Sequence, residues 1–310
     1  MTEERQRTGF GISLKIGAVL CFTIMGALIK GTEGRVPTGE VVFFRSFFAI
    51  PIMIGWLAYV GQLHEGVRTS RPFGHMWRGF IGTTAMGLMF TALTLLPLPE
   101  VTALQYATPL FITILAAILL GERIRLFRMS AVLIGLVGVL VVLSPRLSGF
   151  GEAGGAESLG ALIMIASAVA AALAQVQVRR LVATERPATV ALYFSFSSTL
   201  YALLTLPFGW VIPGGMDAAL LILTGLVGGV GQGIRSSSYR YAPASVIAPF
   251  DYASIFFATA LGMIFFDEVP TRTTLLGAAI VIAAGILIIW RERKLGMNRA
   301  ASRRAKQPPF

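Results

Sequence analysis

The chain has 310 residues, of which 55% are hydrophobic and only 13% charged, and its net charge at pH 7 is +11. A soluble globular chain carries roughly 25% charged residues, and so few charges could not cover the apolar surface of a soluble fold. The basic residues stand in short clusters between apolar runs, which argues against a nucleic-acid partner. The composition therefore predicts a protein whose main partner is the lipid bilayer.

Ten apolar runs follow one another along the chain, each of about the 20 residues that a membrane-spanning helix needs. They cover residues 12–30, 38–59, 76–96, 98–120, 127–143, 158–178, 188–208, 216–239, 242–266 and 273–290. The first run is too long for a signal peptide and has no small-residue cleavage site, so we expect it to be retained. The sequence thus predicts an all-α membrane protein with ten transmembrane helices.

Lysine and arginine residues are distributed unequally between the two sides of these spans. With a cytoplasmic N-terminus, 21 of the 26 fall on the inner side, four on the outer side, and Arg45 within a span. Lys15 and Arg78 are counted here with the inner flanks. The positive-inside rule then predicts a multi-pass protein of the cell inner membrane with both termini cytoplasmic. Residues 292–310 form a basic cytoplasmic tail that could also bind anionic headgroups.

The fourth and ninth runs align with each other without gaps. Tyr106-Ala107 falls on Tyr252-Ala253, and Glu122 falls on Glu268. We therefore expect two repeats, over residues 10–145 and 157–291. Because each repeat has five spans, an odd number, the second must be inverted relative to the first. Inverted repeats are common in secondary transporters, whose substrate site lies near the midplane between the halves.

Three short motifs stand at the second span, at the end of the fourth, and between the eighth and ninth. They are Phe43-Phe44-Arg45-Ser46, Leu120-Gly121-Glu122, and Tyr241-Ala242-Pro243-Ala244-Ser245 leading to Asp267-Glu268. Together they resemble the drug/metabolite transporter superfamily, and within it the EamA-type members. The resemblance covers nearly the whole chain and implies a ten-helix secondary carrier, importing or exporting amino acids, vitamins or nucleoside-like compounds. Asp267 stands where that family usually has Gly.

Asp251 is the one carboxylate that we expect deep in a span, about nine residues or roughly 14 Å into the ninth. An ionisable side chain at such depth is costly and is a functional candidate. It could bind a substrate amine, carry a coupling proton, pair with an arginine, or serve only in helix packing. Its counterpart in the first repeat, Gln105, is polar but does not titrate.

Two arginines accompany Asp251 among the candidate residues. Arg45 is expected about seven residues, or roughly 10 Å, below the outer face, where it could clamp a carboxylate or phosphate, snorkel to the surface, or pair with Glu40. Arg235, near the cytoplasmic end of the eighth span, is expected to anchor or gate. The remaining predicted substrate-binding residues are polar or aromatic: Gln105, Tyr106, Gln175, Gln232 and Tyr252.

Proline and glycine positions predict local features of three spans. Pro109 and Pro249 should kink the fourth and ninth spans and free backbone carbonyls beside a central site. Gly225, Gly229 and Gly233 recur every four residues, which favours close packing of the eighth span against a neighbour.

Function is predicted partly by exclusion. The sequence has no G-x-x-x-x-G-K-[ST] phosphate loop, a single cysteine and no metal-ligand pattern, so we expect no ATPase motor, no metal and no cofactor. An intramembrane enzyme would need a paired nucleophile and base, and a channel a ring of like residues. We predict a secondary transporter, not an enzyme.

The predicted transport is of a small organic metabolite, such as an amino acid or amine, by alternating access. The alternative is an uptake carrier for a vitamin or nucleoside-like metabolite such as riboflavin or S-adenosylmethionine, whose flat ring could stack on Tyr106 and Tyr252. An intramembrane enzyme or a channel is the remote alternative. A homodimer is left open.

Overall fold

A computed structural model describes residues 2–59, 61–120, 126–147 and 155–305. These residues contain helices and no strand, which confirms the predicted all-α class. The long helices are α1 (Thr2–Lys30), α2 (Thr38–Tyr59), α4 (Pro72–Leu95), α5 (Leu98–Gln105), α6 (Thr108–Leu120), α7 (Leu126–Leu147), α8 (Gly155–Leu181), α9 (Pro187–Leu203), α10 (Gly215–Tyr241), α12 (Ser254–Phe266) and α13 (Arg272–Ala305). Four short segments connect them: α3 (Leu63–Val67), η1 (Leu206–Phe208), α11 (Ala244–Ile247) and η2 (Ala248–Ala253).

Seven stretches of the described chain are long and apolar enough to cross a bilayer. They are Thr8–Lys30, Thr38–Tyr59, Leu98–Leu119, Gly155–Leu181, Gly215–Tyr241, Ala248–Phe266 and Arg272–Arg291. A shorter apolar helix covers Met129–Pro145 within α7. The protein is therefore a multi-pass membrane protein.

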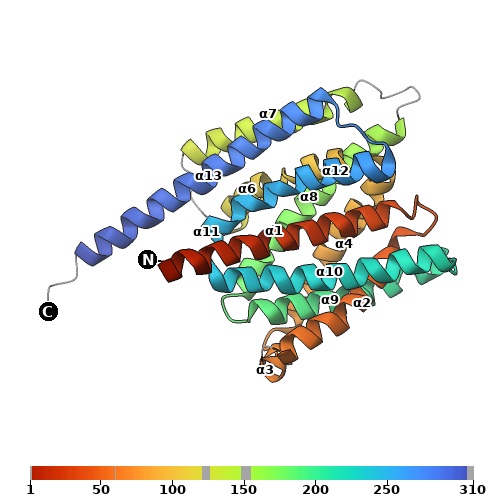
Figure 1. Ribbon diagram of the computed structural model, residues 1–310, viewed down its shortest axis with the longest axis horizontal. Coiled ribbons are helices and arrows are strands. Elements are labelled where there is room, and N and C mark those ends of the chain that lie inside the picture. The colour runs from red at the N-terminus through yellow and green to blue at the C-terminus, as the bar shows by residue number, and fades with distance from the viewer. Residues whose placement is uncertain (1, 60, 121–125, 148–154, 306–310) are drawn as a thin grey trace.

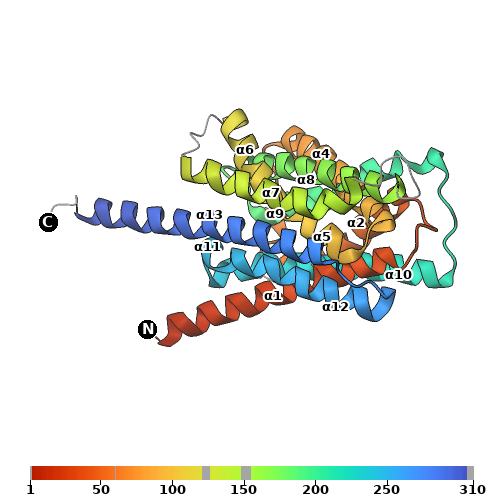
Figure 2. The same ribbon diagram turned by 90° about the horizontal axis from the view of Figure 1, so that it is seen from above.

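Helices far apart in the sequence lie side by side in the bundle. α1 packs against α10 and α4 against α8 in the middle of the molecule, α7 and α13 run together along one edge, and α2 and α9 lie at the opposite edge (Figure 1). Both ends of the chain lie at the same end of the bundle (Figure 2). The backbone of α13 stays helical through the basic tail as far as Ala305 and projects beyond its neighbours.

The fourth and ninth predicted spans are each broken at a proline. The fourth changes direction between α5 and α6 at Tyr106 and Ala107, with Pro109 as the second residue of α6. In the ninth, the 3₁₀ segment η2 contains both Pro249 and Asp251. Proline lacks an N–H group and is tolerated in the first turn of a helix, so each break stands where proline predicts it. The breaks bring irregular backbone into the bundle interior.

Glycines allow α10 to approach α2 closely. A Cβ atom placed on Gly225 would lie 2.5 Å from the Cβ atom of Phe48 and 2.7 Å from the carbonyl oxygen of Phe44. A Cβ atom on Gly229 would lie 2.9 Å from the Cβ atom of Ile52. The predicted packing role of this glycine stripe is confirmed.

Candidate functional site

Three arginines from three helices converge inside the bundle. Arg45 of α2 and Arg78 of α4 share one aromatic ring, because their guanidinium carbons lie 5.7 Å and 3.7 Å from the ring centroid of Phe194 on α9. Arg235 of α10 lies over Phe22 of α1, 5.9 Å from the ring centroid. The charges of Arg45 and Arg235 both act on Arg78. We call Arg45, Arg78 and Arg235 the arginine cluster.

The arginine cluster has no counter-charge in the part of the chain that the structure describes. Arg45 is only 8% exposed, and the Nε and Nη1 atoms of both Arg45 and Arg78 are buried without a hydrogen-bond partner. None of the ion pairs between described residues includes a member of the cluster. Glu40, considered above as a partner of Arg45, instead accepts a hydrogen bond from the backbone N–H of Val211 at 3.1 Å.

Stability does not account for such a cluster. A guanidinium group stays protonated in a protein, and placing one at the centre of a membrane helix costs about 2.5–3.5 kcal/mol on insertion scales. A cation–π contact returns about 0.5–2 kcal/mol, so Phe194 offsets only part of the cost for the two arginines beside it. The remaining penalty points to a functional role.

Glycines leave space beside two of these side chains. A Cβ atom on Gly82 would lie 2.8 Å from Cε2 of Phe194 and 3.4 Å from Nη1 of Arg78. A Cβ atom on Gly228 would lie 3.7 Å from Nε of Arg45. The backbone thus leaves room for the guanidinium groups between helices.

The position of Arg78 corrects the sequence analysis, which counted it with the basic residues of the inner flank. It is half-buried in α4 and its guanidinium group points into the protein toward Phe194. Gly82, one helical turn later, is a signal that could have identified it, because a small residue beside a long one opens space on that face of a helix.

Asp251 pairs with a lysine, not with an arginine. Its Oδ1 atom lies 2.7 Å from Nζ of Lys15 on α1. Lys15 is fully buried, whereas the side chain of Asp251 is 48% exposed. The lysine Nζ atom also lies 5.6 Å from the ring centroid of Tyr239 on α10. Lys15, which was counted with the inner flanks, therefore has its side chain inside the protein.

Tyr106 and Tyr252 form the joint between the two broken spans. The Tyr106 hydroxyl lies 3.0 Å from the carbonyl oxygen of Tyr252 and 2.7 Å from the hydroxyl of Ser254, and it accepts a hydrogen bond from the N–H of Ile255. The two rings meet edge to face with centroids 5.0 Å apart. Both residues are 8% exposed, so each ring is already covered by protein.

The other predicted binding residues lie on separate helices. Gln105, at the end of α5, is exposed and its Nε2 atom lies 3.2 Å from the sulfur of Met89. Gln175 is half-buried on α8. Gln232 is half-buried on α10, one turn before Arg235, so it shares a helix with one member of the arginine cluster.

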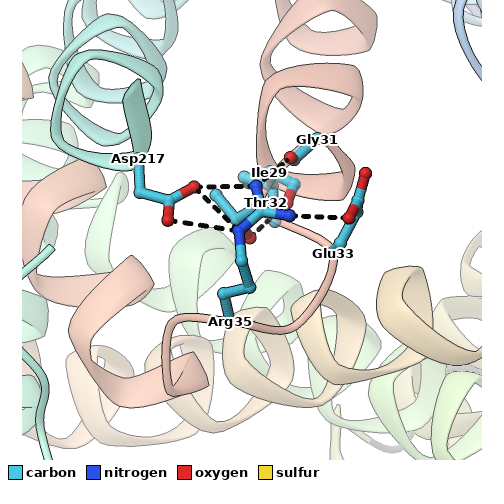
Figure 3. Close-up of polar contacts among 6 residues, drawn as sticks. All are labelled: Ile29, Gly31, Thr32, Glu33, Arg35 and Asp217. Atoms are coloured by element: carbon cyan, nitrogen blue, oxygen red, sulfur yellow. Dashed lines mark hydrogen bonds and ion pairs between the residues drawn. The ribbon is translucent and has the colours of Figure 1, made fainter. Parts of the chain in front are cut away.

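Polar contacts cross-link the end of the bundle opposite the termini. Arg35, in the connection between α1 and α2, lies between Asp217 of α10 and Glu33 (Figure 3). Its Nη2 atom donates to Asp217 at 2.9 Å and to the carbonyl oxygen of Gly31 at 3.0 Å. The hydrogen bond to Asp217 is the main reason that the pKa of Arg35 is raised above its ordinary value. We call the Arg35–Asp217 contact the latch.

A second ion pair at the same end joins α1 to the ninth span. Nζ of Lys30 lies 2.8 Å from a carboxylate oxygen of Glu268 and donates to the carbonyl oxygens of Leu93 and Leu96. The other Glu268 oxygen accepts from the N–H of Leu98 at 2.8 Å. The two lysines of α1 therefore contact the ninth span in its middle, at Asp251, and just beyond its end, at Glu268.

The opposite end is linked through Glu185, in the connection between α8 and α9. One carboxylate oxygen accepts hydrogen bonds from the Thr69 hydroxyl and from the hydroxyl and N–H of Ser70, at 2.8–3.0 Å. The other lies 3.8 Å from Nε2 of His75. Burial would raise the pKa of Glu185, but these hydrogen bonds and the nearby histidine outweigh it and hold the pKa below its ordinary value.

Charged side chains gather in the interior of the described bundle. Across the described residues no three His, Cys, Asp or Glu side chains come together as a metal site. The polar interior consists of guanidinium, ammonium, carboxylate and amide groups contributed by helices from both ends of the sequence. Such an arrangement recognises a polar molecule by charge and by hydrogen bonding.

Comparison with known proteins agrees with this architecture. The model of the EamA-like transporter family matches residues 9–144 and again residues 158–290. The chain is similar to the S-adenosylmethionine uptake transporter of Rickettsia prowazekii, with 28% identity over 92% of this chain and 94% of that protein. It is also similar to the pseudopaline exporter of Pseudomonas aeruginosa, with 30% identity over 90% of this chain and 95% of that protein.

A riboflavin transporter of Rhizobium johnstonii is 26% identical over 94% of each chain. One crystal structure shares the fold with a TM-score of 0.64 and 24% identity, over 92% of this chain and 98% of its own. The family model covers most of the sequence, and the named relatives that match it over nearly their full length are transporters. The chain belongs to the EamA-like transporter family, within the drug/metabolite transporter superfamily.

Proposed function

We propose that this chain is a secondary transporter with ten spans, arranged as two inverted repeats over residues 10–145 and 157–291. The neighbours of each helix support the repeat. If α1 corresponds to α8, α2 to α9, α4 to α10 and α7 to α13, then the α1–α10 contact exchanges with α8–α4, and α2–α10 exchanges with α9–α4. The α7–α13 contact maps onto itself. The family model also matches each half separately.

The ten-span arrangement requires that α4, α7 and α9 also cross the membrane. α4 has 24 residues and α7 has 22, which at 1.5 Å per residue exceeds the roughly 30 Å of the hydrocarbon core. α9 has 17 residues, and η1 continues its path to Phe208. The charge on α4 belongs to Arg78, whose contact with Phe194 directs it inward. With the positive-inside rule, both termini lie in the cytoplasm and the host membrane is the cell inner membrane.

The observation that carries the proposal is the polar interior at the boundary between the two repeats. Arg45 and Arg78 come from the first repeat, while Arg235 and Phe194 come from the second. Lys15 of the first repeat pairs with Asp251 of the second. A transporter of this architecture binds its substrate where its repeats meet and exposes that site to each side in turn.

The proposed substrate is a small organic metabolite, with an amino acid or amine as the broadest choice. Arg45, Gln232 and Arg235 are its proposed contacts from α2 and α10, and Gln105, Gln175, Tyr106 and Tyr252 stay candidates from the other helices. Asp251 is the proposed coupling residue, because it is titratable, half-exposed and paired with a buried lysine. The uptake of a vitamin or nucleoside-like metabolite is the second candidate, favoured by the names of two relatives.

The test is flux into proteoliposomes that contain the purified protein. Labelled riboflavin, S-adenosylmethionine and a mixture of amino acids are each offered with and without an imposed pH gradient. Saturable, protein-dependent flux of one compound, with loss of its pH dependence in Asp251→Asn, supports both the transporter and the coupling role. Flux that does not saturate, or that equals the flux of empty liposomes for every compound, contradicts the proposal.

A further inference from the structure

We propose that the arginine cluster is the binding subsite for a substrate with at least two oxyanion charges, a dicarboxylate or acidic amino acid in the first place. The inference rests on the proposed transport function and names the substrate class that the same interior would select.

The number of positive charges in the arginine cluster indicates whether its ligand carries one anionic group or two. Arg45 and Arg78 bring two permanent positive charges to one ring, that of Phe194, and Arg235, over Phe22, brings a third that acts on Arg78. A single carboxylate would leave most of this charge uncompensated in an interior of low dielectric constant. A molecule with two or three carboxylates could neutralise it.

The neighbouring ionisable groups do not supply the missing negative charge. Lys15 and Asp251 form a pair with no net charge. One oxygen of Glu185 lies 3.8 Å from Nε2 of His75, and the other already accepts three hydrogen bonds from Thr69 and Ser70. The cluster is therefore left with donors that a bound molecule can use.

The donors also have the geometry that oxyanions need. A guanidinium group presents its N–H groups as a planar fork that matches carboxylate or phosphate oxygens in pairs. The buried Nε and Nη1 atoms of Arg45 and Arg78 are unpartnered within the described chain, and Phe194 supports both groups from one ring. Gly82 lets Phe194 and Arg78 approach the backbone of α4, and Gly228 lets Met25 and Arg45 approach the backbone of α10. The site is organised before the ligand arrives.

The competing interpretation is that the arginines only hold helices together. In that case the packing of the helices depends on the positive charge of the arginines and not on the planar fork of their N–H groups. The charge of a substrate would then have no influence on its binding. Arg78→Lys distinguishes the two, because it keeps the charge and removes the fork. Arg240→Gln is the matched control, since Arg240 is an exposed arginine on the same helix as Arg235 and its guanidinium group contacts Gln62 and Trp56.

The experiment measures binding and transport separately. Purified protein in detergent is titrated by calorimetry with succinate, citrate, glutamate, glycerol phosphate, lysine and riboflavin, and the same probes are used for flux in proteoliposomes. We expect saturable binding of the multiply anionic probes and none of lysine. The affinity should fall at least tenfold in Arg78→Gln, fall measurably in Arg78→Lys, and stay unchanged in Arg240→Gln.

The outcomes separate the two proposals. Preference for glycerol phosphate over the carboxylates supports the oxyanion site and identifies a phosphate ester as its ligand. Binding of anions without flux supports the site and counts against transport. Flux of lysine or riboflavin with no binding of any anion, or anion affinity that is equal in wild type, Arg78→Lys and Arg78→Gln, overturns the inference and leaves the transporter standing. Where Arg78→Gln fails to fold, the Arg78→Lys comparison decides.

Discussion

Lys15 and Asp251 form an ion pair in which the lysine side chain is buried and the aspartate side chain is about half exposed. The Nζ atom of Lys15 is fully buried and lies 2.7 Å from Oδ1 of Asp251, whose side chain keeps 48% of its exposure. The pair joins α1 to the 3₁₀ segment η2, in the middle of the broken ninth span. A proton or a substrate amine that reaches Asp251 competes directly with Lys15. This relationship makes the attachment of η2 to α1 sensitive to what occupies the site.

Removing the carboxylate should therefore destabilise the protein. Asp251→Asn leaves a buried ammonium group without its counter-charge, which costs about 3–5 kcal/mol for a fully buried pair and less here, because the side chain of Asp251 is 48% exposed. We expect a lower melting temperature in detergent, and flux that no longer responds to a pH gradient. Lys15→Met/Asp251→Asn should recover the stability, because an apolar side chain of similar length replaces the stranded charge, but not the pH response.

The control for this pair is Asp267→Asn. Asp267 is an exposed acid at the end of α12 with φ of 53°, a conformation that asparagine also adopts. Its melting temperature and flux should equal those of wild type. Wild-type stability together with wild-type pH dependence in Asp251→Asn would reduce the ion pair to a packing contact.

The approach of α10 to α2 predicts a second difference between variants. In Gly225→Ala the new methyl group would meet Phe48 at 2.5 Å and the backbone of Phe44 at 2.7 Å, so the helices must separate. Overpacking of this kind costs about 1–3 kcal/mol, and thermal melting should detect it. Gly87→Ala on α4 is the matched control, because nothing lies within 4 Å of the added atom, and it should be neutral or slightly stabilising. Equal melting temperatures for the two variants would refute the close approach.

Hydropathy and proline positions predicted much of the fold because they act locally. Apolar runs produce helices in a bilayer wherever they occur, and Pro109 and Pro249 mark the breaks in two of them. The packing role of Gly225 was likewise visible in its four-residue spacing. These features depend on near neighbours in the sequence and need no knowledge of the other helices.

The composition of the site depended on information that the sequence does not display. Position along a helix indicates depth, but the direction of a side chain depends on how the helix is rotated against its neighbours. Lys15 and Arg78 stand near the ends of apolar runs and therefore resembled solvated flanks, yet both point inward. Arg78 meets Phe194, which is more than a hundred residues away in the sequence, and only the packing of α4 against α9 brings them together.

We expect Glu185 to make the stability of the folded protein depend on pH. Its pKa lies below the ordinary value of 4.5 in the folded protein, so the unfolded chain takes up a proton first as the pH falls. The stabilisation is complete well above that value and is lost as the pH falls through the lowered folded pKa. Glu185→Gln should melt earlier than wild type at pH 7, and the difference should shrink as the pH falls below 4.5.

Ser70→Ala tests the origin of that effect. It removes the hydroxyl donor at 2.9 Å and keeps the backbone donor at 2.8 Å, so it should show a smaller difference with the same dependence on pH. A difference between Glu185→Gln and wild type that stays constant from pH 7 to pH 4 would show that the carboxylate charge is not involved.

Breaking the latch between Arg35 and Asp217 should change access to the interior more than it changes stability. Arg35 is 46% exposed and Asp217 is 16% exposed, and ion pairs between solvent-accessible groups contribute little to the free energy of unfolding. We therefore expect the latch to have little effect on folding and to act instead on how readily this end of the bundle opens. The assay places one cysteine at the half-buried Gln232 of α10 (Gln232→Cys) in a Cys21→Ser background, with an impermeant maleimide added on the side of the latch.

Asp217→Asn should speed labelling, and about 1 M salt should do the same in the protein with Asp217 intact, since it shortens the screening length to about 3 Å. Arg272→Ala, which removes an exposed arginine at the same end of the bundle, should leave the rate unchanged. Labelling at the wild-type rate in Asp217→Asn would mean that the bundle end is held closed by Lys30 and Glu268 and not by the latch.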